Sequence, residues 1–219
     1  MNEIIPTVVP KSLADIEAAH ARYGSMAHTL HVDATDGDFA FPTTWMPSEG
    51  DALPAWSGVW EVHVMVHDPR AAGEAFARAG AWRIIAHVEA LGSAEDARNS
   101  FALWRLAGAR EAVTALLIDT PIDTLEPIAE EINAIHLMSI VHIGAQGQEL
   151  DERVYDRIAE AKQRFPHLPI AIDGGVNESN IAALVEAGAT RLCVGAALAR
   201  VADPRAAYDA LAHAAHAVQ

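Results

Sequence analysis

Short apolar runs rich in β-branched residues alternate with alanine-rich amphipathic segments along the whole chain. The apolar runs predict eight strands, at 4–9, 28–34, 60–66, 83–89, 112–118, 134–140, 169–173 and 190–195. The amphipathic segments predict helices near 12–22, 70–79, 94–107, 123–131, 151–165, 177–187 and 204–217. The connection 35–59 is rich in Pro, Gly and Trp, so we expect an irregular loop there, with room for one short helical turn.

Residues at the element boundaries support this alternation. Ser12 and Ser93 stand where helix N-caps are expected, and an Ala-Gly-Ala sequence joins helix to strand at 79–81 and again at 187–189. No change of composition and no linker divides the eight repeated units. We therefore predict a single α/β domain over residues 1–219, folded as a (β/α)8 TIM barrel, with a doubly wound open sheet as the alternative.

The polar residues that close the strands form the list of candidates, because barrel enzymes carry their sites at the carboxyl ends of the strands. His31 and Asp33 are two apart in one strand and share a face, as do Glu61, His63 and Met65 in the next. Asp173 ends the seventh strand. Two imidazoles and two carboxylates predict a site for a divalent transition metal, while proton transfer is a second use of the pair His31 and Asp33. Taken singly, His63 could be a hydrogen-bonded core residue and Asp173 a helix cap.

Glycines follow the last two strands, where barrels often bind phosphate through backbone amides. Gly174-Gly175-Val176-Asn177 comes after the seventh strand, and Gly195-Ala196-Ala197 after the eighth. Each could be a plain turn, but together they predict a phosphorylated ligand. The polar loop 143–148 follows the sixth strand, either as a mobile cover that excludes water or as an ordinary surface loop.

Charge and cysteine content limit the partners. Thirty acidic and fifteen basic residues give a formal charge of −15, which argues against nucleic acid or an anionic membrane as the main partner. The single cysteine, Cys193, excludes an internal disulfide and suits a reducing compartment. The first residues lack the pattern of a signal peptide, and no apolar run approaches the roughly 18 residues of a membrane span. We expect a cytoplasmic protein.

Seven stretches, in this order and spacing, resemble the ribulose-phosphate 3-epimerase family over essentially the full chain. They are His31–Gly37, Val62–Val66, His87–Ala90, Met138-Ser139, Gly144–Gln148, Ile172–Asn177 and Val194–Ala197. The resemblance implies a (β/α)8 barrel that inverts carbon 3 of a ketopentose 5-phosphate, most simply D-ribulose 5-phosphate to D-xylulose 5-phosphate, through an enediolate. It also implies one divalent metal ion, zinc, iron or manganese, held by His31, Asp33, His63 and Asp173. Asp33 and Asp173 would also be the acid–base pair on opposite faces of the substrate.

The same resemblance implies which residues contact the ketose phosphate. The hydroxyl of Thr7 matches an early serine of the family, and two methionines match methionines that line the family's pocket. The glycine-rich loops match the loops that bind phosphate through backbone amides. The implied substrate-binding residues are Thr7, Met65, Met138, Gly144, Gly147, Gly174, Gly175, Gly195 and Ala196. We also expect a homo-oligomer.

Several positions depart from the family pattern. Pro10 replaces a second early serine, Thr35 replaces a methionine, and Ala196 replaces the serine of the last phosphate loop. The segments 38–59 and 141–148 also differ, the second being one residue longer and lacking a phenylalanine. The substrate could therefore be another ketose phosphate, such as a ketohexose 6-phosphate. Two further functions remain as alternatives: another enolisation reaction, such as isomerisation, and non-catalytic binding of a sugar phosphate by a sensor.

Overall fold

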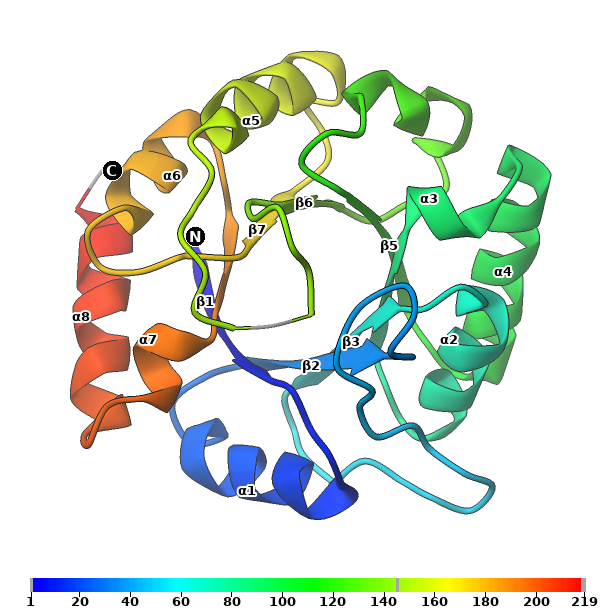
Figure 1. The fold of residues 1–219 in the computed structure, drawn as a ribbon, viewed down its shortest axis with the longest axis horizontal. Helices are drawn as coiled ribbons and strands as arrows, with labels where there is room; N and C mark the ends of the chain where they lie inside the picture. Colours follow the sequence, from blue (N-terminus) through cyan, green and yellow to red (C-terminus); the bar gives the residue numbers. More distant parts are fainter. Residues whose placement is uncertain (1, 145, 218–219) are drawn as a thin grey trace.

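Eight parallel strands close into a barrel in chain order, as Figure 1 shows in a view down the barrel. The computed structural model describes residues 2–144 and 146–217. This architecture confirms the predicted (β/α)8 fold. The strands are β1 (Glu3–Val8), β2 (Thr29–Thr35), β3 (Val59–Met65), β4 (Arg83–His87), β5 (Glu111–Leu116), β6 (Ile135–Met138), β7 (Ile170–Asp173) and β8 (Arg191–Val194).

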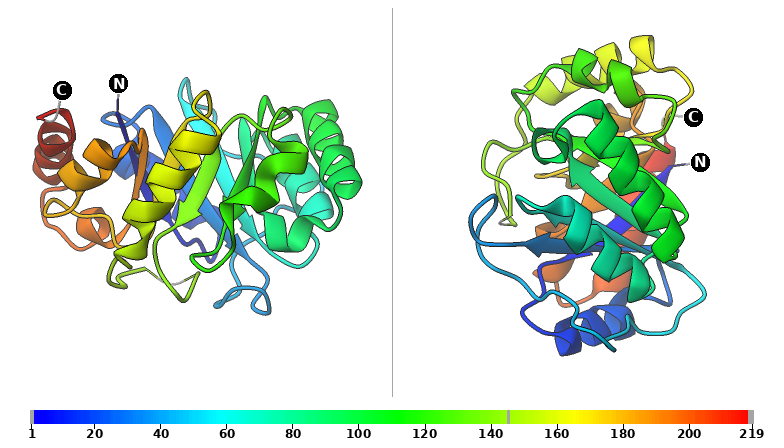
Figure 2. Two further views of the ribbon diagram at one scale, coloured as in Figure 1. Left: turned by 90° about the horizontal axis from the view of Figure 1, so that it is seen from above. Right: turned by 90° about the vertical axis from the view of Figure 1, so that its right-hand side faces the viewer.

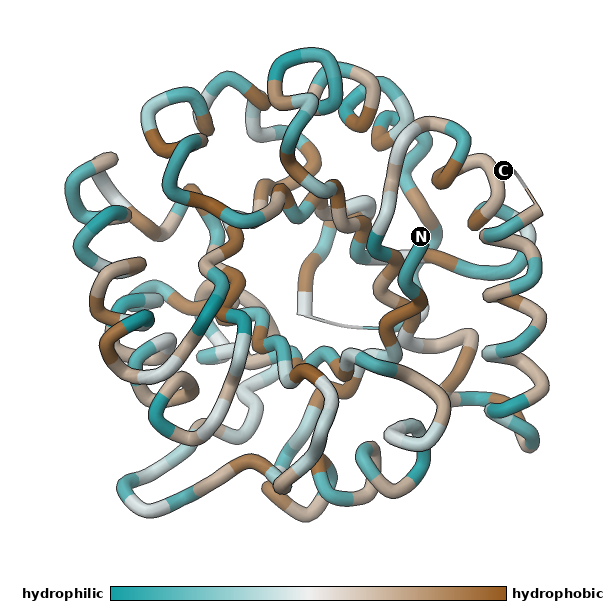
Figure 3. The backbone as a smooth tube through the Cα atoms, turned by 180° about the vertical axis from the view of Figure 1, so that it is seen from behind, coloured by the Kyte–Doolittle hydropathy of each residue, from teal (hydrophilic) through white to brown (hydrophobic). Residues whose placement is uncertain are grey.

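Helices surround the barrel on its outer side, as the views in Figures 1 and 2 agree. Their apolar faces pack on the outer faces of the strands, and in Figure 3 brown segments recur along the central strands. The helical elements are α1 (Leu13–Tyr23), α2 (Pro69–Arg78), α3 (Val88–Leu91), α4 (Ala94–Ala107), the 3-10 helix η1 (Ile122–Ile128), α5 (Arg153–Arg164), α6 (Ile181–Ala187), α7 (Ala196–Ala199) and α8 (Pro204–His216). None of the described helices is both long enough and apolar enough to cross a membrane.

Local sequence explains where the longer helices begin and end. The Ser93 hydroxyl accepts a hydrogen bond from the Asp96 N–H at 3.1 Å, and the Asp96 carboxylate accepts from the Ser93 N–H at 3.1 Å, which forms a capping box for α4. Gly188 ends α6 with a φ of 125°, a conformation that a residue with a Cβ adopts only under strain. These caps lie at positions that the sequence predicted.

Three predicted helical features differ in the structure. The segment 123–131 forms the 3-10 helix Ile122–Ile128, because Pro127 cannot donate a backbone hydrogen bond. The helix expected from residue 177 begins at Ile181, since the side chain of Asn180 hydrogen-bonds the Asn177 N–H at 2.9 Å and competes with the helical pattern. The four-residue helices α3 and α7 were not predicted, because such short elements carry no periodic signal.

The loop 36–58 lies beside the carboxyl ends of β1 and β2 and is irregular, as predicted, without the short helical turn for which the sequence left room. Backbone contacts fix it instead. The Thr35 hydroxyl donates to the Pro42 carbonyl, and the Thr35 N–H donates to the Thr44 hydroxyl at 2.8 Å. The Trp45 N–H donates to the Pro10 carbonyl at 2.9 Å. Thr35 and Pro10, two departures from the family pattern, therefore hold this loop.

Candidate active site

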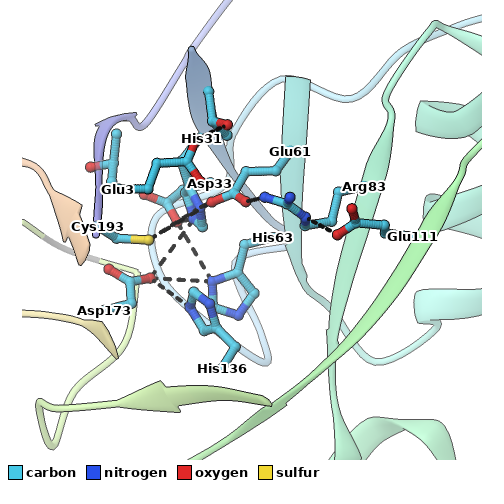
Figure 4. Close-up of polar contacts among 12 residues, drawn as sticks. Glu3, His31, Asp33, Glu61, His63, Arg83, Glu111, His136, Asp173 and Cys193 are labelled. Atoms are coloured by element: carbon cyan, nitrogen blue, oxygen red, sulfur yellow. Dashed lines mark hydrogen bonds and ion pairs between the residues drawn. The ribbon is translucent and has the colours of Figure 1, made fainter. Parts of the chain in front are cut away.

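The four predicted metal ligands, His31, Asp33, His63 and Asp173, meet at the carboxyl end of the barrel (Figure 4). One ligand atom from each of them lies within 4.8 Å of every other. Strand alternation turns His31 and Asp33 inward together, and the register pairs Asp33 with His63 on β3. His31 Nε2 lies 3.2 Å from Asp33 Oδ1 and 3.8 Å from Asp173 Oδ2. Residues from three strands therefore form one cluster.

A buried carboxylate fixes the imidazole of His31. The Nδ1–H group of His31 donates to Glu61 Oε1 at 2.7 Å, which leaves Nε2, 3.2 Å from Asp33 Oδ1, as the nitrogen that would bind a metal ion in place of a proton. Glu61 also accepts a hydrogen bond from Arg83, whose Nε–H donates to Glu111 at 2.7 Å. Burial alone would raise the pKa of Glu61, but His31 and Arg83 outweigh it and hold this pKa far below its usual range. Figure 4 shows this series of paired charges running away from the carboxylates.

His63 is held from the other direction. Its Nε2 lies 2.9 Å from His87 Nε2, and His87 Nδ1 lies 3.2 Å from Glu89 Oε2. One proton per ring satisfies both contacts when His63 donates to His87 and His87 donates to Glu89. The Nδ1 atom of His63 then carries a lone pair, is buried, and makes no hydrogen bond within the described chain. It faces Asp173 Oδ2 at 3.4 Å. A nitrogen that could bind a metal ion therefore lies beside the carboxylate, as a metal site requires.

The two carboxylates have unlike environments although both are buried. Burial raises the pKa of Asp33 above its ordinary value. Burial acts in the same direction on Asp173, but the neighbouring imidazoles, first of all the hydrogen-bonded His136, outweigh it and hold the pKa of Asp173 well below the usual range. Neighbouring groups whose pKa values diverge in this way are typical of acid–base sites.

A second donor set, His31, Glu61 and Cys193, lies deeper in the barrel. His31 Nδ1 and the carboxylate of Glu61 are already paired with each other, and Glu61 is paired with Arg83. Burial also raises the pKa of the Cys193 thiol, which keeps it protonated at neutral pH. This set therefore lacks the unpaired, deprotonated donors that the first set offers.

The four-residue cluster opens into a cavity of about 340 Å³, within the range of small-molecule sites. Asp33 and Asp173 line it, while His31 and His63 are fully buried behind them. All nine predicted substrate-binding residues lie on its wall: Thr7, Met65, Met138, Gly144, Gly147, Gly174, Gly175, Gly195 and Ala196.

Loops after β6, β7 and β8 meet in this wall. Gly175 has a φ of 69°, and a Cβ there would lie 2.5 Å from the Leu150 N atom, so only glycine fits. In the loop after β6, the Gln146 side chain donates to the Thr7 hydroxyl at 2.8 Å. Ala145, within the predicted loop 143–148, lies outside the described residues. The predicted role of this loop as a mobile cover remains a prediction.

Sequence analysis missed three charged or titratable residues of the site region. His136 contacts Asp173, Arg83 pairs with Glu61, and Arg200 lines the cavity beside the glycine-rich loops. His136 stands two residues before Met138, so strand alternation could have placed it on the inner face. Arg83 shares a register position with Glu61, and this pairing of opposite charges on adjacent strands was a readable signal. Arg200 follows the unpredicted helix α7 and carried no such signal.

Comparison with known proteins identifies relatives of this site and fold. The profile of the ribulose-phosphate 3 epimerase family matches residues 4–199. The ribulose-phosphate 3-epimerase of Bacillus subtilis is 30% identical over 187 residues, covering 83% of this chain and 84% of the relative. That of Chlamydia trachomatis serovar D is 32% identical over 194 residues, covering 85% of this chain and 81% of the relative.

Solved structures share the barrel. A 3-hexulose-6-phosphate synthase aligns with a TM-score of 0.71 at 16% identity, over 97% of this chain and 99% of that chain. KGPDC from Streptococcus mutans aligns with a TM-score of 0.76 at 10% identity, over 100% of this chain and 99% of that chain. At such low identity these likenesses establish the fold alone. The family profile and the sequence relatives go further: the chain belongs to the ribulose-phosphate 3-epimerase family, whose members are isomerases.

Proposed function

We propose that this protein is a metal-dependent epimerase that inverts carbon 3 of a ketose phosphate, with D-ribulose 5-phosphate and D-xylulose 5-phosphate as its substrate pair. The observation that carries the proposal is the convergence of Asp33 and Asp173, from β2 and β7, on one cavity with His31 and His63 beside them. A binding protein would have no need of two buried carboxylates at one point.

The reaction accounts for both carboxylates. The hydrogen on carbon 3 is acidic because it is adjacent to a ketone, and its removal gives an enediolate. One carboxylate removes this proton and the other, once protonated, delivers a proton to the opposite face. A single carrier would return the proton to the face it came from. The raised pKa of Asp33 and the lowered pKa of Asp173 suit a pair in which one group is protonated while the other is ionised.

The donor set fits a divalent ion. His31 Nε2 and His63 Nδ1 would be its nitrogen ligands, and Asp33 and Asp173 its oxygen ligands. Zinc, iron and manganese all accept such mixed ligands. Once bound, the ion would stabilise the negative charge that develops on the substrate oxygens, as a Lewis acid. Glu61 and His87 orient the two imidazoles from behind.

The opposite side of the cavity suits a phosphate. Backbone of Gly174, Gly175 and Gly195 lines that wall without side chains, which allows close approach of an anion to peptide N–H groups. Arg200 is the one lysine or arginine among the described residues that line the cavity. Because the chain carries a net charge of −15, we assign to Arg200 the attraction of the phosphate dianion.

Metal removal tests the proposal. Protein purified without chelator should contain about one divalent ion per chain by elemental analysis and should convert ribulose 5-phosphate to xylulose 5-phosphate. Chelation should abolish the conversion, and zinc, iron(II) or manganese should restore it. Full activity of protein that retains less than a few hundredths of an ion per chain would refute the metal dependence.

A further inference from the structure

His136 lies beside the proposed metal site but is not one of its four donors. It belongs to β6, its side chain is fully buried, and its Nε2 lies 3.2 Å from Asp173 Oδ2. We infer that His136 is a positioning residue, which donates a hydrogen bond to Asp173 and holds that carboxylate for metal binding and proton transfer. This inference rests on the proposed function.

Strand register brings the two groups together. Met138 on β6 pairs with Asp173 on β7, and His136 stands two residues earlier on the same inner face. The imidazole is also packed between two others: its centroid lies 5.7 Å from that of His31, in a stacked arrangement, and 4.7 Å from that of His63. Figure 4 shows the His136 ring below Asp173 and beside His63. Packing therefore leaves the ring little freedom to turn away.

The protonated nitrogen of His136 follows from its surroundings. Nδ1 is buried, and no atom of the described residues hydrogen-bonds it. A buried N–H without an acceptor is strongly disfavoured, whereas Nε2 faces a carboxylate oxygen. We therefore place a proton on Nε2, from which the ring donates a hydrogen bond to Asp173. Nε2 is used in this way, and His136 is not among the four residues whose ligand atoms lie within 4.8 Å of one another, so we do not count the ring as a fifth metal ligand.

The hydrogen bond from His136 is accepted by the Asp173 oxygen that faces the two histidine ligands. Asp173 Oδ2, the acceptor from His136, is also the atom 3.4 Å from His63 Nδ1 and 3.8 Å from His31 Nε2. Without His136, the Asp173 side chain would be free to rotate this oxygen away from the two donors. Loss of an outer hydrogen-bond partner typically weakens metal binding about 10- to 100-fold.

Three substitutions separate the hydrogen bond from the bulk of the ring. His136→Gln places an amide N–H near the position of Nε2, His136→Asn is too short to reach Asp173, and His136→Leu fills space without a donor. The measurement is Mn²⁺ affinity, by competition with a fluorescent chelator, on metal-stripped protein whose fold is checked by circular dichroism. We expect His136→Leu and His136→Asn to weaken binding about 10-fold or more, and His136→Gln to stay within about 3-fold of wild type.

The outcomes distinguish this inference from the proposed function. Equal Mn²⁺ affinity in wild type, His136→Leu and His136→Asn would overturn the role of His136 and leave the metal site intact. Affinity in His136→Gln as poor as in His136→Leu would mean that an N–H donor at this place does not support metal binding, which also overturns it. Wild-type protein that binds no Mn²⁺, Zn²⁺ or Fe²⁺ would overturn the proposed metal site, and this inference with it. If His136→Leu does not fold, the comparison of Gln with Asn decides alone.

Discussion

At the scale of single residues, the site depends on which nitrogen each histidine presents. His31 is held through Nδ1 by Glu61 and presents Nε2, whereas His63 is held through Nε2 by His87 and presents Nδ1. Two different hydrogen-bond partners thus orient the two imidazoles toward the same point. The partner of His31 is the charged Glu61, which is paired with Arg83. The partner of His63 is the imidazole of His87, which in turn contacts Glu89.

Substitution of Glu61 tests whether its negative charge orients His31 for metal binding. Glu61→Gln keeps the shape but removes the charge that pairs with Arg83 and secures the proton on His31 Nδ1. We expect metal affinity to fall about 10-fold or more. Because Arg83 would be left buried with Glu111 alone, the free energy of unfolding should fall by about 3 kcal/mol, measured by urea denaturation.

The matched control for Glu61→Gln is Asp209→Asn, which also removes one acidic partner of an arginine. Asp209 pairs with Arg205 on the exposed surface of α8, where ion pairs contribute little. It should leave both the urea midpoint and the metal affinity unchanged. If Glu61→Gln behaves like this control, the proposed role of Glu61 in orienting His31 is wrong.

At the scale of elements, the strand ends carry the chemistry and the loops shape the cavity. The two segments that depart from the family pattern, 38–59 and 141–148, touch each other. Thr35 and Pro10 hold the loop 36–58, and the backbone of Phe41 in that loop packs against Gly144, where a Cβ would collide with the Phe41 carbonyl oxygen. The changes in the two loops are therefore physically coupled at the mouth of the cavity.

Substitution of Arg200 tests the assignment of the phosphate end. Arg200→Gln removes the positive charge from the wall next to Gly147 and Ala196. Because this charge would act on the phosphate and not on carbon 3, we expect KM for ribulose 5-phosphate to rise about 10-fold or more with kcat changed less than about 3-fold. Steady-state kinetics with purified variants gives both constants.

Arg205→Gln is the control for Arg200→Gln, because it removes an arginine from the exposed face of α8 and keeps the same net charge as the test variant. An equal rise in KM for both variants would mean that only the overall charge matters. In that case Arg200 has no direct role at the phosphate.

At the scale of the whole molecule, the periodic pattern was sufficient to predict the fold. Eight strands and the long helices followed from alternating apolar runs and from caps such as Ser93 and Gly188. The inward pairing of His31 with Asp33 followed from strand alternation alone. The irregular parts did not follow, because side-chain-to-backbone bonds of Asn180 and Thr35, and the ring of Pro127, decide them locally.

The site residues also divide into those that the sequence pattern could locate and those that it could not. Those on strands, including the missed His136 and Arg83, obey alternation and register and could be found from sequence. Arg200 lies at the cavity because it directly follows α7, a helix too short to be predicted from the sequence pattern. The tautomers of the histidines also depend on partners from several strands, so they required the structure.

Buried His87 makes the stability of the molecule depend on pH. Burial lowers the pKa of His87 below its ordinary 6.5, although its hydrogen bond to Glu89 acts in the opposite direction. As the pH falls below 6.5, the unfolded chain binds a proton at this residue before the folded chain does, so stability falls with pH. One such histidine contributes a slope of at most about 1.4 kcal/mol per pH unit.

Urea denaturation of the metal-stripped protein between about pH 7 and pH 5 measures this slope. In His87→Gln the ionisable ring is absent, so stability should fall less steeply over this interval than in wild type. A slope that is unchanged or steeper in His87→Gln would contradict the assignment of a neutral buried imidazole at this position.

Solvent exchange at carbon 3 tests the central claim most directly. Ribulose 5-phosphate incubated with the metal-loaded enzyme in D₂O should form xylulose 5-phosphate that carries deuterium at carbon 3, detected by mass spectrometry and NMR. Asp33→Asn and Asp173→Asn should each slow epimerisation by a factor of about 10² to 10⁴ while metal content is monitored. Xylulose 5-phosphate formed without deuterium at carbon 3, or full epimerisation by either variant, would contradict proton transfer by these two carboxylates.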